Sequence, residues 1–257
     1  MPIAVVLDYD KTLSPHHMQE DAVLGPLGID IESFWRGSDA LVRERRYDRE
    51  LAWMYRLLEI PQIRGMTVED LRSLGRRLVF YPGVPEIFDE LPGVEYYIVT
   101  AGLREILEGS ALASRVRQIF GCEYDVDETG LLWRPKRTIG HTTKTQMLFR
   151  INKNLLDMNE DVNAPMPDES RRIPFPRMIY VGDGPTDVPC FTVVTKYGGK
   201  AIAVYDPADR RAHAQGEELF RLGRVDRVCP ADYRAGSELR RTLEEFISEI
   251  RSREHAA

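Results

Sequence analysis

Short apolar runs that end in polar turns constrain the fold of this chain more than any other feature. Five of them occur, at residues 3–7, 94–100, 177–181, 201–205 and, more weakly, 224–229. Runs of this length without strict alternation are typical of strands that are buried on both faces of a sheet. Helical spacing separates them, so the sequence predicts an α/β fold with a parallel sheet covered by helices on both faces.

The predicted helices alternate with the strands, as parallel connections require. Helical spacing occurs at residues 103–117, 143–156, 208–222 and 237–251. The last of these segments places a stripe of apolar side chains on one helix face. In open parallel sheets ligands bind beyond the carboxyl ends of the strands, so we expect the chemistry at that edge.

Two segments interrupt this alternation. Residues 14–80 carry only helical spacing, and we interpret them as a helical cap domain inserted into a core domain of residues 1–13 and 81–257. Residues 157–176 are rich in proline, asparagine and acidic residues, which predicts an irregular, solvated surface loop. A turn-like sequence predicts a small hairpin over residues 124–133.

Composition argues against several classes of protein. A formal net charge of −6 disfavours a nucleic-acid partner and docking on anionic membranes. The three cysteines, Cys122, Cys190 and Cys229, are too widely spaced for a zinc site or a disulfide framework, so we expect buried free thiols. The N-terminus is unlike a signal peptide, and no apolar run approaches the ~20 residues that span a bilayer. We therefore expect a cytoplasmic protein without a membrane partner.

Four aspartates fall at the ends of predicted strands or in the turns that follow. Asp8 and Asp10 follow the first strand, and Asp183 and Asp187 follow the strand at residues 177–181. Singly, each is typical of a turn or a helix N-cap. Carboxylates that converge at one edge repel each other unless a cation compensates, and oxygen ligands suit Mg2+. Two aspartates one residue apart can divide attack on phosphorus and proton transfer between them.

Lys144 is a candidate for binding a phosphoryl oxygen. Thr143 and Gln146 match a capping box, which predicts Lys144 as the first residue of a helix. Because helix N-termini attract anions, an ammonium group there can help to hold a phosphate. A solvated surface lysine is the alternative, and Lys136 is the weaker competitor for the role.

Thr100 and the two residues after it form a second candidate for phosphate binding. The hydroxyl of Thr100 and the N–H groups of Ala101 and Gly102 can hold a phosphate, although a plain helix N-cap is an equal alternative. Gly184 and Pro185 suit a tight turn before a helix, in the sequence GDGPTD. That sequence lacks the GxGxxG spacing of a dinucleotide site.

Together these motifs resemble the haloacid dehalogenase superfamily. DYDKT at residues 8–12 looks like its first motif, Thr100 its second, Lys144 its third and GDGPTD at residues 182–187 its fourth. The order of the motifs and their strand context agree over nearly the whole chain. The insertion at residues 14–80 looks like a type 1 cap, and the predicted hairpin is similar to the phosphoserine phosphatase-like branch.

The resemblance implies a Rossmann-like sheet and a phosphoryl-transfer site. It implies an aspartyl-phosphate intermediate on Asp8 and proton transfer by Asp10. It also implies Mg2+ held by the Asp8 side chain, the Asp10 backbone carbonyl and Asp183, with Asp187 in support. The predicted substrate- and phosphate-binding residues are Tyr9, Thr100, Ala101, Gly102 and Lys144.

Asp10 narrows the predicted activity. Family dehalogenases lack a carboxylate at that position and P-type ATPases carry threonine, so Asp10 indicates a phosphatase or a phosphomutase. The sequence predicts a Mg2+-dependent hydrolase of a small phosphorylated metabolite. A phosphomutase and a non-catalytic phosphate-binding scaffold are the alternatives.

The sequence leaves the substrate and the oligomeric state open. In phosphoserine phosphatases, a glutamate shortly after the first motif binds the amino group of the substrate. Glu20 lies in the corresponding region of this chain, but the sequence does not assign it to that position. Candidates in the cap for selecting the substrate are His16, His17, Trp35, Arg36, Arg43, Arg45 and Arg46. For most of these, a solvated helix face or a loop is the more typical role.

Overall fold

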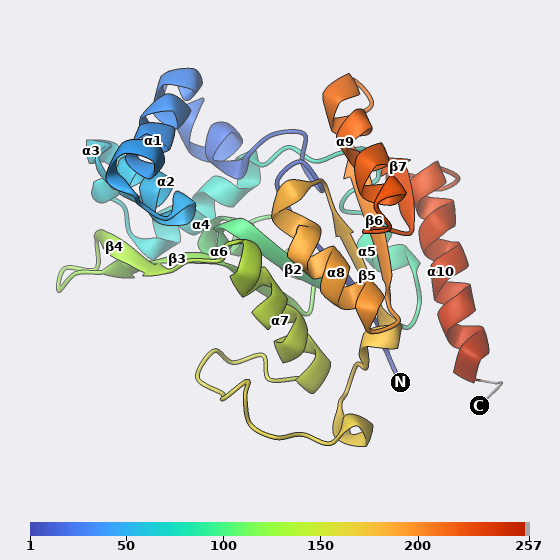
Figure 1. Ribbon diagram of the computed structural model, residues 1–257. Helices are drawn as coiled ribbons and strands as arrows, with labels where there is room; N and C mark the ends of the chain where they lie inside the picture. The colour runs from blue at the N-terminus through green and yellow to red at the C-terminus, as the bar shows by residue number, and fades with distance from the viewer. Residues whose placement is uncertain (255–257) are drawn as a thin grey trace.

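The computed structural model describes residues 1–254, and their sheet has seven strands in the order β4-β3-β2-β1-β5-β6-β7 (Figure 1). All neighbouring pairs are parallel except the antiparallel β3–β4 pair. The predicted α/β class is therefore confirmed. The strands are β1 (Ile3–Leu7), β2 (Val94–Leu103), β3 (Gln118–Val126), β4 (Leu132–Arg137), β5 (Met178–Gly182), β6 (Lys200–Tyr205) and β7 (Arg227–Pro230).

The central strand β1 is the point at which the order of the sheet reverses. It pairs with β2 on one side and with β5 on the other, so that Leu7 lies opposite both Ile98 and Val181. Every residue of β1 is buried, which explains why its sequence is apolar throughout. A reversal of strand order opens a crevice at the carboxyl ends of the strands, and this places β1, β2 and β5 at the edge where ligands bind.

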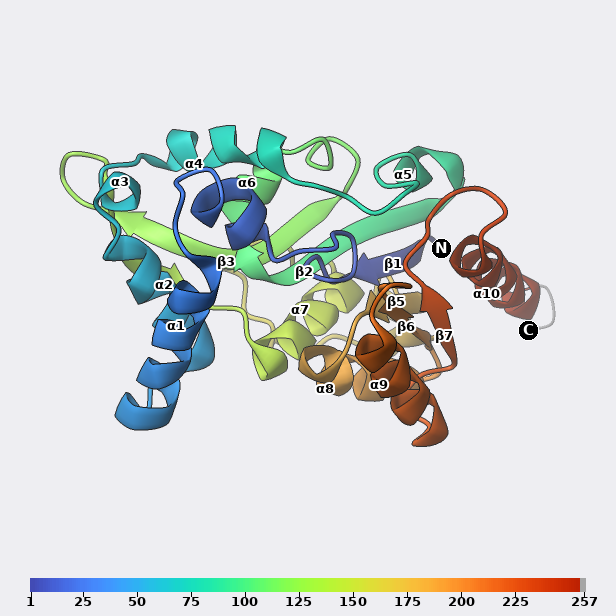
Figure 2. The same cartoon turned by 90° about the horizontal axis from the view of Figure 1, so that it is seen from above.

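Helices cover both faces of the sheet. Figure 2 shows α7 (His141–Lys153), α8 (Val188–Lys196) and α9 (Arg210–Arg221) on one side, with α5 (Ile87–Glu90) and α6 (Arg104–Glu108) on the other. The last helix, α10 (Glu238–Glu254), lies beside β7. Its predicted apolar stripe is buried against the body of the protein, at Leu239, Leu243, Phe246, Ile247 and Ile250.

The helix predicted at residues 103–117 is wrong in length. Strand β2 continues to Leu103, and α6 ends at Glu108. Ser110 explains the early end, because its hydroxyl donates to the Leu107 carbonyl and accepts from the Leu112 N–H. Such local bonds offer the backbone an alternative to the helix.

The segment at residues 14–80 is helical, as the spacing predicted. It contains a short π-helix (Glu20–Leu24), α1 (Ile31–Arg45), α2 (Arg49–Leu58), α3 (Pro61–Arg64), α4 (Val68–Leu74) and a 3-10 turn (Gly75–Arg77). Helices α1 and α2 pack on each other, whereas α4 packs on α6 of the core. The close α4–α6 approach requires Gly75, since a Cβ atom there would lie 2.2 Å from the Ile106 carbonyl oxygen. The division into cap and core domains stays a prediction.

The predicted hairpin and surface loop both occur. Strands β3 and β4 form the hairpin, and Gly130 closes its turn with a positive φ of 84° and an N–H bond to the Asp127 carbonyl. The loop after α7 contains only two short 3-10 turns, Asp168–Ser170 and Phe175–Arg177. It is tied to α7, because Arg150 and Lys153 together donate to five backbone carbonyls between residues 155 and 164.

The structure bears on two predictions made from composition. Cys122, Cys190 and Cys229 are free and buried. Among residues 1–254, no helix is both long enough and apolar enough to cross a membrane. The cytoplasmic location stays a prediction.

Candidate active site

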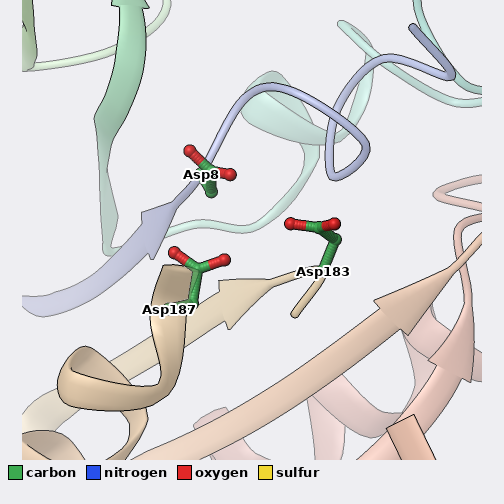
Figure 3. A group of neighbouring side chains, drawn as sticks. All are labelled: Asp8, Asp183 and Asp187. Carbon is green, nitrogen blue, oxygen red and sulfur yellow. The ribbon is translucent and has the colours of Figure 1, made fainter. Parts of the chain in front are cut away.

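Three carboxylates converge at the carboxyl ends of β1 and β5. Asp8 directly follows β1, Asp183 follows β5, and Asp187 lies in the 3-10 turn Pro185–Asp187 that leads into α8 (Figure 3). Each offers an oxygen atom within 4.8 Å of the others. The Asp8 N–H donates to the Val181 carbonyl at 3.0 Å, which continues the β1–β5 pairing to the site. The chain order of these aspartates therefore becomes a cluster in space.

Lys144 lies between two of these carboxylates. Its Nζ atom is 2.8 Å from Asp8 Oδ1 and 2.8 Å from Asp187 Oδ1, and its side chain is 1% exposed. The alternative of a solvated surface lysine is therefore wrong. The competitor Lys136 lies on β4, with a half-exposed side chain that faces Glu123. Thus α7 brings an ammonium group to the aspartates.

The predicted start of the helix that carries Lys144 is wrong. Helix α7 begins at His141, so Lys144 is its fourth residue and not its first. The N-cap is Gly140, whose N–H donates to Thr143 Oγ1 at 2.6 Å. The Thr143 hydroxyl thus accepts from the Gly140 N–H, which has no partner within the helix. Because α7 begins three residues earlier than predicted, Lys144 lies within its first full turn, and its side chain is buried.

The electrostatics of the cluster favour a divalent cation. Burial raises the pKa of Asp8 above its ordinary value, although Lys144 opposes the shift. Burial and then the charge of Asp187 raise the pKa of Asp183 to about 7. Burial alone would lower the pKa of Lys144, but Asp187 and Asp8 outweigh it and raise that pKa. One ammonium group leaves these carboxylates undercompensated, and their oxygens fit the ligand preference of Mg2+.

Asp187 is fixed by its neighbours. The Tyr180 hydroxyl donates to Asp187 Oδ1 at 2.6 Å. A Cβ atom at Gly182 would lie 2.5 Å from Asp187 Oδ2. The first glycine of GDGPTD is therefore required by close packing of the carboxylate. Gly184, by contrast, has open space around its Cα within the described chain.

Asp10 is oriented by the segment that follows the first motif. Its Oδ1 accepts from the Met18 N–H at 2.8 Å, and its Oδ2 lies 3.8 Å from His17 Nδ1. Burial alone would lower the pKa of His17, but the Asp10 carboxylate outweighs it and raises that pKa. The left-handed backbone of Lys11, with a φ of 61°, turns the chain between Asp10 and this segment.

Met18 is a site residue that the sequence prediction missed. Its sulfur accepts from the Leu103 N–H at 2.9 Å, and its methyl group occupies the space that a Cβ atom at Gly102 would need. Met18 therefore connects Asp10 with the end of β2. Gly102 is the signal that could have found it, because a glycine beside a motif often marks a close approach.

The phosphate-binding predictions at the end of β2 have a specific geometry. Thr100 is not an N-cap, since β2 runs on to Leu103. Its Oγ1 accepts from the Gly102 N–H at 2.9 Å and is buried, as is the side chain of Tyr9. Ala101 lines the cavity beside the aspartates. The binding roles of these residues stay predictions.

A cavity of about 350 Å³ lies over the cluster. Its floor is formed by Asp8, Asp10, Ala101, Lys144, Asp183 and Thr186. The other lining residues come from the turn after β1, from the π-helix and from α1 and α2: Lys11, His17, Gln19, Glu20, Trp35, Ser38, Asp39, Arg49, Glu50 and Trp53. The segment at residues 14–80 therefore closes the site from above.

Only two of the seven candidates for substrate selection line this cavity. They are His17 and Trp35. His16 pairs with Asp21, and Arg36 pairs with Glu32 on the exposed side of α1. Arg43, Arg45 and Arg46 lie at or beyond the far end of α1 and are exposed. The lining face of α1 follows the helical repeat at positions 35, 38 and 39, which a search for arginines could not find.

Known proteins share both sequence and fold with this chain. A sequence model of the haloacid dehalogenase-like hydrolase family matches residues 5–192, well over half of the chain. An uncharacterized protein of Borreliella burgdorferi is 27% identical over 282 aligned positions, which cover 95% of this chain and 96% of that protein.

Solved structures extend the likeness in fold. A substrate-bound phosphoserine phosphatase superposes with a TM-score of 0.60 at 17% identity, over 95% of this chain and 98% of that one. A phosphoserine phosphohydrolase-like protein of Francisella tularensis gives 0.55 at 18% identity, over 88% and 94%. A hydrolase of Salmonella enterica gives 0.56 at 17% identity; the match covers 79% of this chain and 62% of the hydrolase. At these identities the likeness shows a shared architecture.

Proposed function

The chain belongs to the haloacid dehalogenase-like hydrolase family, and on that premise we propose that it is a Mg2+-dependent phosphatase of a small phosphorylated metabolite. The observation that carries the proposal is the buried Asp8–Lys144–Asp187 cluster, with both Nζ–carboxylate distances at 2.8 Å. Asp10 lines the same cavity. A nucleophile, a second carboxylate for proton transfer and a fixed cation are the groups that phosphoryl transfer through an enzyme intermediate requires.

The first half of the proposed reaction transfers the phosphoryl group to the protein. An Asp8 carboxylate oxygen forms a bond to phosphorus while the bond between phosphorus and the leaving alcohol oxygen breaks. Asp10, held by the Met18 N–H, gives its proton to that oxygen. Lys144 offsets negative charge on the nucleophile and on the phosphoryl oxygens.

The second half releases phosphate. Asp10 takes a proton from a water molecule, which attacks phosphorus and breaks its bond to Asp8. A Mg2+ ion, bound by Asp8, Asp183 and the Asp10 carbonyl with Asp187 in support, would neutralise charge on the transferring group. Asp187 is itself held by Lys144 and Tyr180, which suits a supporting role.

The presence of Asp10 supports a phosphatase over a dehalogenase. Departure of an alcohol needs a proton donor at the leaving oxygen, whereas departure of a halide does not. Asp10 is the carboxylate that borders the cavity two residues after Asp8.

Release of inorganic phosphate from p-nitrophenyl phosphate with Mg2+ tests the proposal. We expect turnover that EDTA abolishes, and we expect Asp8→Asn to lose at least a thousandfold in kcat while its circular dichroism spectrum is unchanged. Asp168→Asn is the matched control, because that side chain is 88% exposed on the loop after α7. Full turnover in Asp8→Asn would contradict the proposal. Transfer of phosphate between substrates without stoichiometric release would indicate a mutase instead.

A further inference from the structure

Tyr180 is a buried tyrosine to which the sequence motifs assign no role. It lies in β5 two residues before GDGPTD, and its side chain is fully buried. Its hydroxyl donates to Asp187 Oδ1 at 2.6 Å, and its ring packs edge-to-face on Phe191 of α8, with ring centroids 5.5 Å apart. Because the strand and the packed ring fix its position, Tyr180 can hold the Asp187 carboxylate in one orientation.

The two carboxylate oxygens of Asp187 have different surroundings. Oδ1 accepts from the Tyr180 hydroxyl and from Lys144 Nζ, which lies 2.8 Å away. Oδ2 is buried and accepts no hydrogen bond within residues 1–254. A carboxylate oxygen has about two lone-pair sites, so the two donors fill Oδ1 and leave Oδ2 without a partner. The carboxylate points toward Asp8 and Asp183 (Figure 3), so the unpaired oxygen borders the carboxylate cluster.

Another buried tyrosine shows what a purely structural pair looks like. Tyr97 is equally buried, and its hydroxyl donates to Glu95 at 2.8 Å. Both oxygens of Glu95 also accept from Arg172, so this carboxylate is fully paired within the fold. The Tyr180–Asp187 pair instead leaves a buried oxygen unpaired, which is costly unless a ligand satisfies it.

The contacts of Tyr180 separate its effect from that of Lys144. Lys144 also contacts Asp8, so its loss changes the nucleophile. The Tyr180 hydroxyl donates to Asp187 alone, and Asp187 is the carboxylate that supports the cation in the proposed reaction. The terminal torsion of an aspartate side chain is broad, so without this donor the Asp187 carboxylate can rotate and lose the orientation of Oδ2.

We propose, on the basis of the proposed function, that Tyr180 is a positioning residue that sets the affinity of the site for Mg2+. By occupying Oδ1 together with Lys144, its hydroxyl keeps Asp187 Oδ2 available to the cation or to a water molecule bound to it. Loss of a hydrogen-bond partner of this kind typically changes metal affinity by about 10- to 100-fold. The effect of Tyr180 should therefore fall on binding of the cation and not on the transfer step.

Isothermal titration calorimetry with Mg2+ alone, without substrate, measures this affinity directly. Tyr180→Phe keeps the ring and removes only the hydroxyl, so we expect its Kd for Mg2+ to rise at least about tenfold. Tyr97→Phe is the matched control, because it removes a hydroxyl from an equally buried tyrosine near the start of β2. It should bind Mg2+ with the wild-type affinity.

Turnover gives a second measurement of the same role. The Mg2+ concentration at half-maximal phosphate release should rise at least about tenfold in Tyr180→Phe, whereas kcat at saturating Mg2+ should stay close to the wild-type value. A change in packing alone would not move this Mg2+ dependence. A lower kcat at every Mg2+ concentration, with an unchanged half-maximal point, would overturn the proposal.

Asp187→Asn tests whether Tyr180 acts through Asp187. This variant should weaken Mg2+ binding, and adding Tyr180→Phe to it should have little further effect, because the two residues act as one unit. Wild-type affinity in Asp187→Asn, or full additivity of the two substitutions, would overturn the role of Tyr180. The affinity of Asp187→Asn also decides the question if Tyr180→Phe does not fold.

The failures of the two proposals are distinguishable. Unchanged Mg2+ affinity in a Tyr180→Phe variant with the wild-type circular dichroism spectrum would overturn the role of Tyr180 and leave the phosphatase intact. Wild-type protein that binds Mg2+ but releases no phosphate from p-nitrophenyl phosphate would overturn the proposed function, and calorimetry would still decide on Tyr180. Absence of Mg2+ binding to the wild-type protein would overturn both proposals.

Discussion

The floor and the roof of the cavity are built on different physical principles. The floor comes from strand ends of the core and from α7, and at its centre the charges of Asp8, Lys144 and Asp187 are buried and paired with one another. The roof comes from α1 and α2, where Asp39 and Arg49 are exposed and have no partner within residues 1–254. Preorganised charges suit the transfer of the phosphoryl group, because every substrate carries that group. Side chains without a partner in the protein can instead bind the leaving group, which differs from one substrate to another.

Lys144→Met changes the floor of the cavity and should have the largest effect on both stability and turnover. The variant leaves two buried carboxylates facing each other without their cation, so we expect a loss of about 3–5 kcal/mol in the free energy of unfolding. Turnover should fall by at least roughly a hundredfold. Urea denaturation and phosphate release measure the two effects. Lys136→Met, on the exposed side of β4, should change neither; equal effects in both variants would refute the assignment.

Gly182→Ala tests whether close packing, and not only charge, maintains the floor. The new methyl group would lie 2.5 Å from Asp187 Oδ2, so the carboxylate must move. We expect a loss of about 1–3 kcal/mol in stability, and at least a tenfold drop in kcat as Asp187 leaves Lys144. Gly184→Ala is the matched control two residues away, with open space and an extended φ of 177°. A normal kcat in Gly182→Ala would show that Asp187 need not be fixed.

Glu105 is another buried carboxylate, and it forms no ion pair within residues 1–254. It lies in α6, 4% exposed, and burial raises its pKa to about 7. Because that pKa exceeds the unfolded value, the folded protein holds a proton that the unfolded chain releases, and stability falls as pH rises from about 4.5 to 7. Glu105→Gln should remove this dependence and raise the free energy of unfolding at pH 8 by roughly 1–2 kcal/mol.

Denaturation at pH 4 and pH 8 measures the effect of Glu105→Gln. The gain should be absent at pH 4, where both states of the wild-type protein are largely protonated at this residue. Glu108→Gln, on the same helix but paired with Arg104 at 2.8 Å, is the control without a gain. A gain of equal size at pH 4 would show that packing, not charge, is responsible.

The floor was more predictable than the roof for a physical reason. Strand polarity brings every residue that follows a parallel strand to one edge, so Asp8 and Asp183 could be placed together from the alternation of strands and helices alone. The roof depends on which face of α1 turns inward, and that is decided by packing against α2. The prediction therefore included arginines of α1 that do not line the cavity, and it missed the lining residues Gln19, Ser38 and Trp53.

Trp35→Phe probes the roof alone and should have the smallest effect. The indole donates to Glu20 at 2.8 Å and packs on His17, with ring centroids 5.4 Å apart. Phenylalanine keeps an aromatic ring but removes the hydrogen-bond donor. Loss of one such hydrogen bond costs about 1 kcal/mol of binding free energy, which corresponds to roughly a fivefold loss in kcat/KM.

Trp35→Phe should lower kcat/KM by raising KM, while kcat stays unchanged. The reason is that kcat depends on the residues of the floor, which this substitution does not alter. Trp133→Phe is the control, since that side chain is 49% exposed on the hairpin and lies outside the cavity lining. A fall in kcat as large as the rise in KM would contradict this expectation. It would show that Trp35 contributes to the transfer step through His17 and Asp10, and that His17 belongs with the residues of the floor.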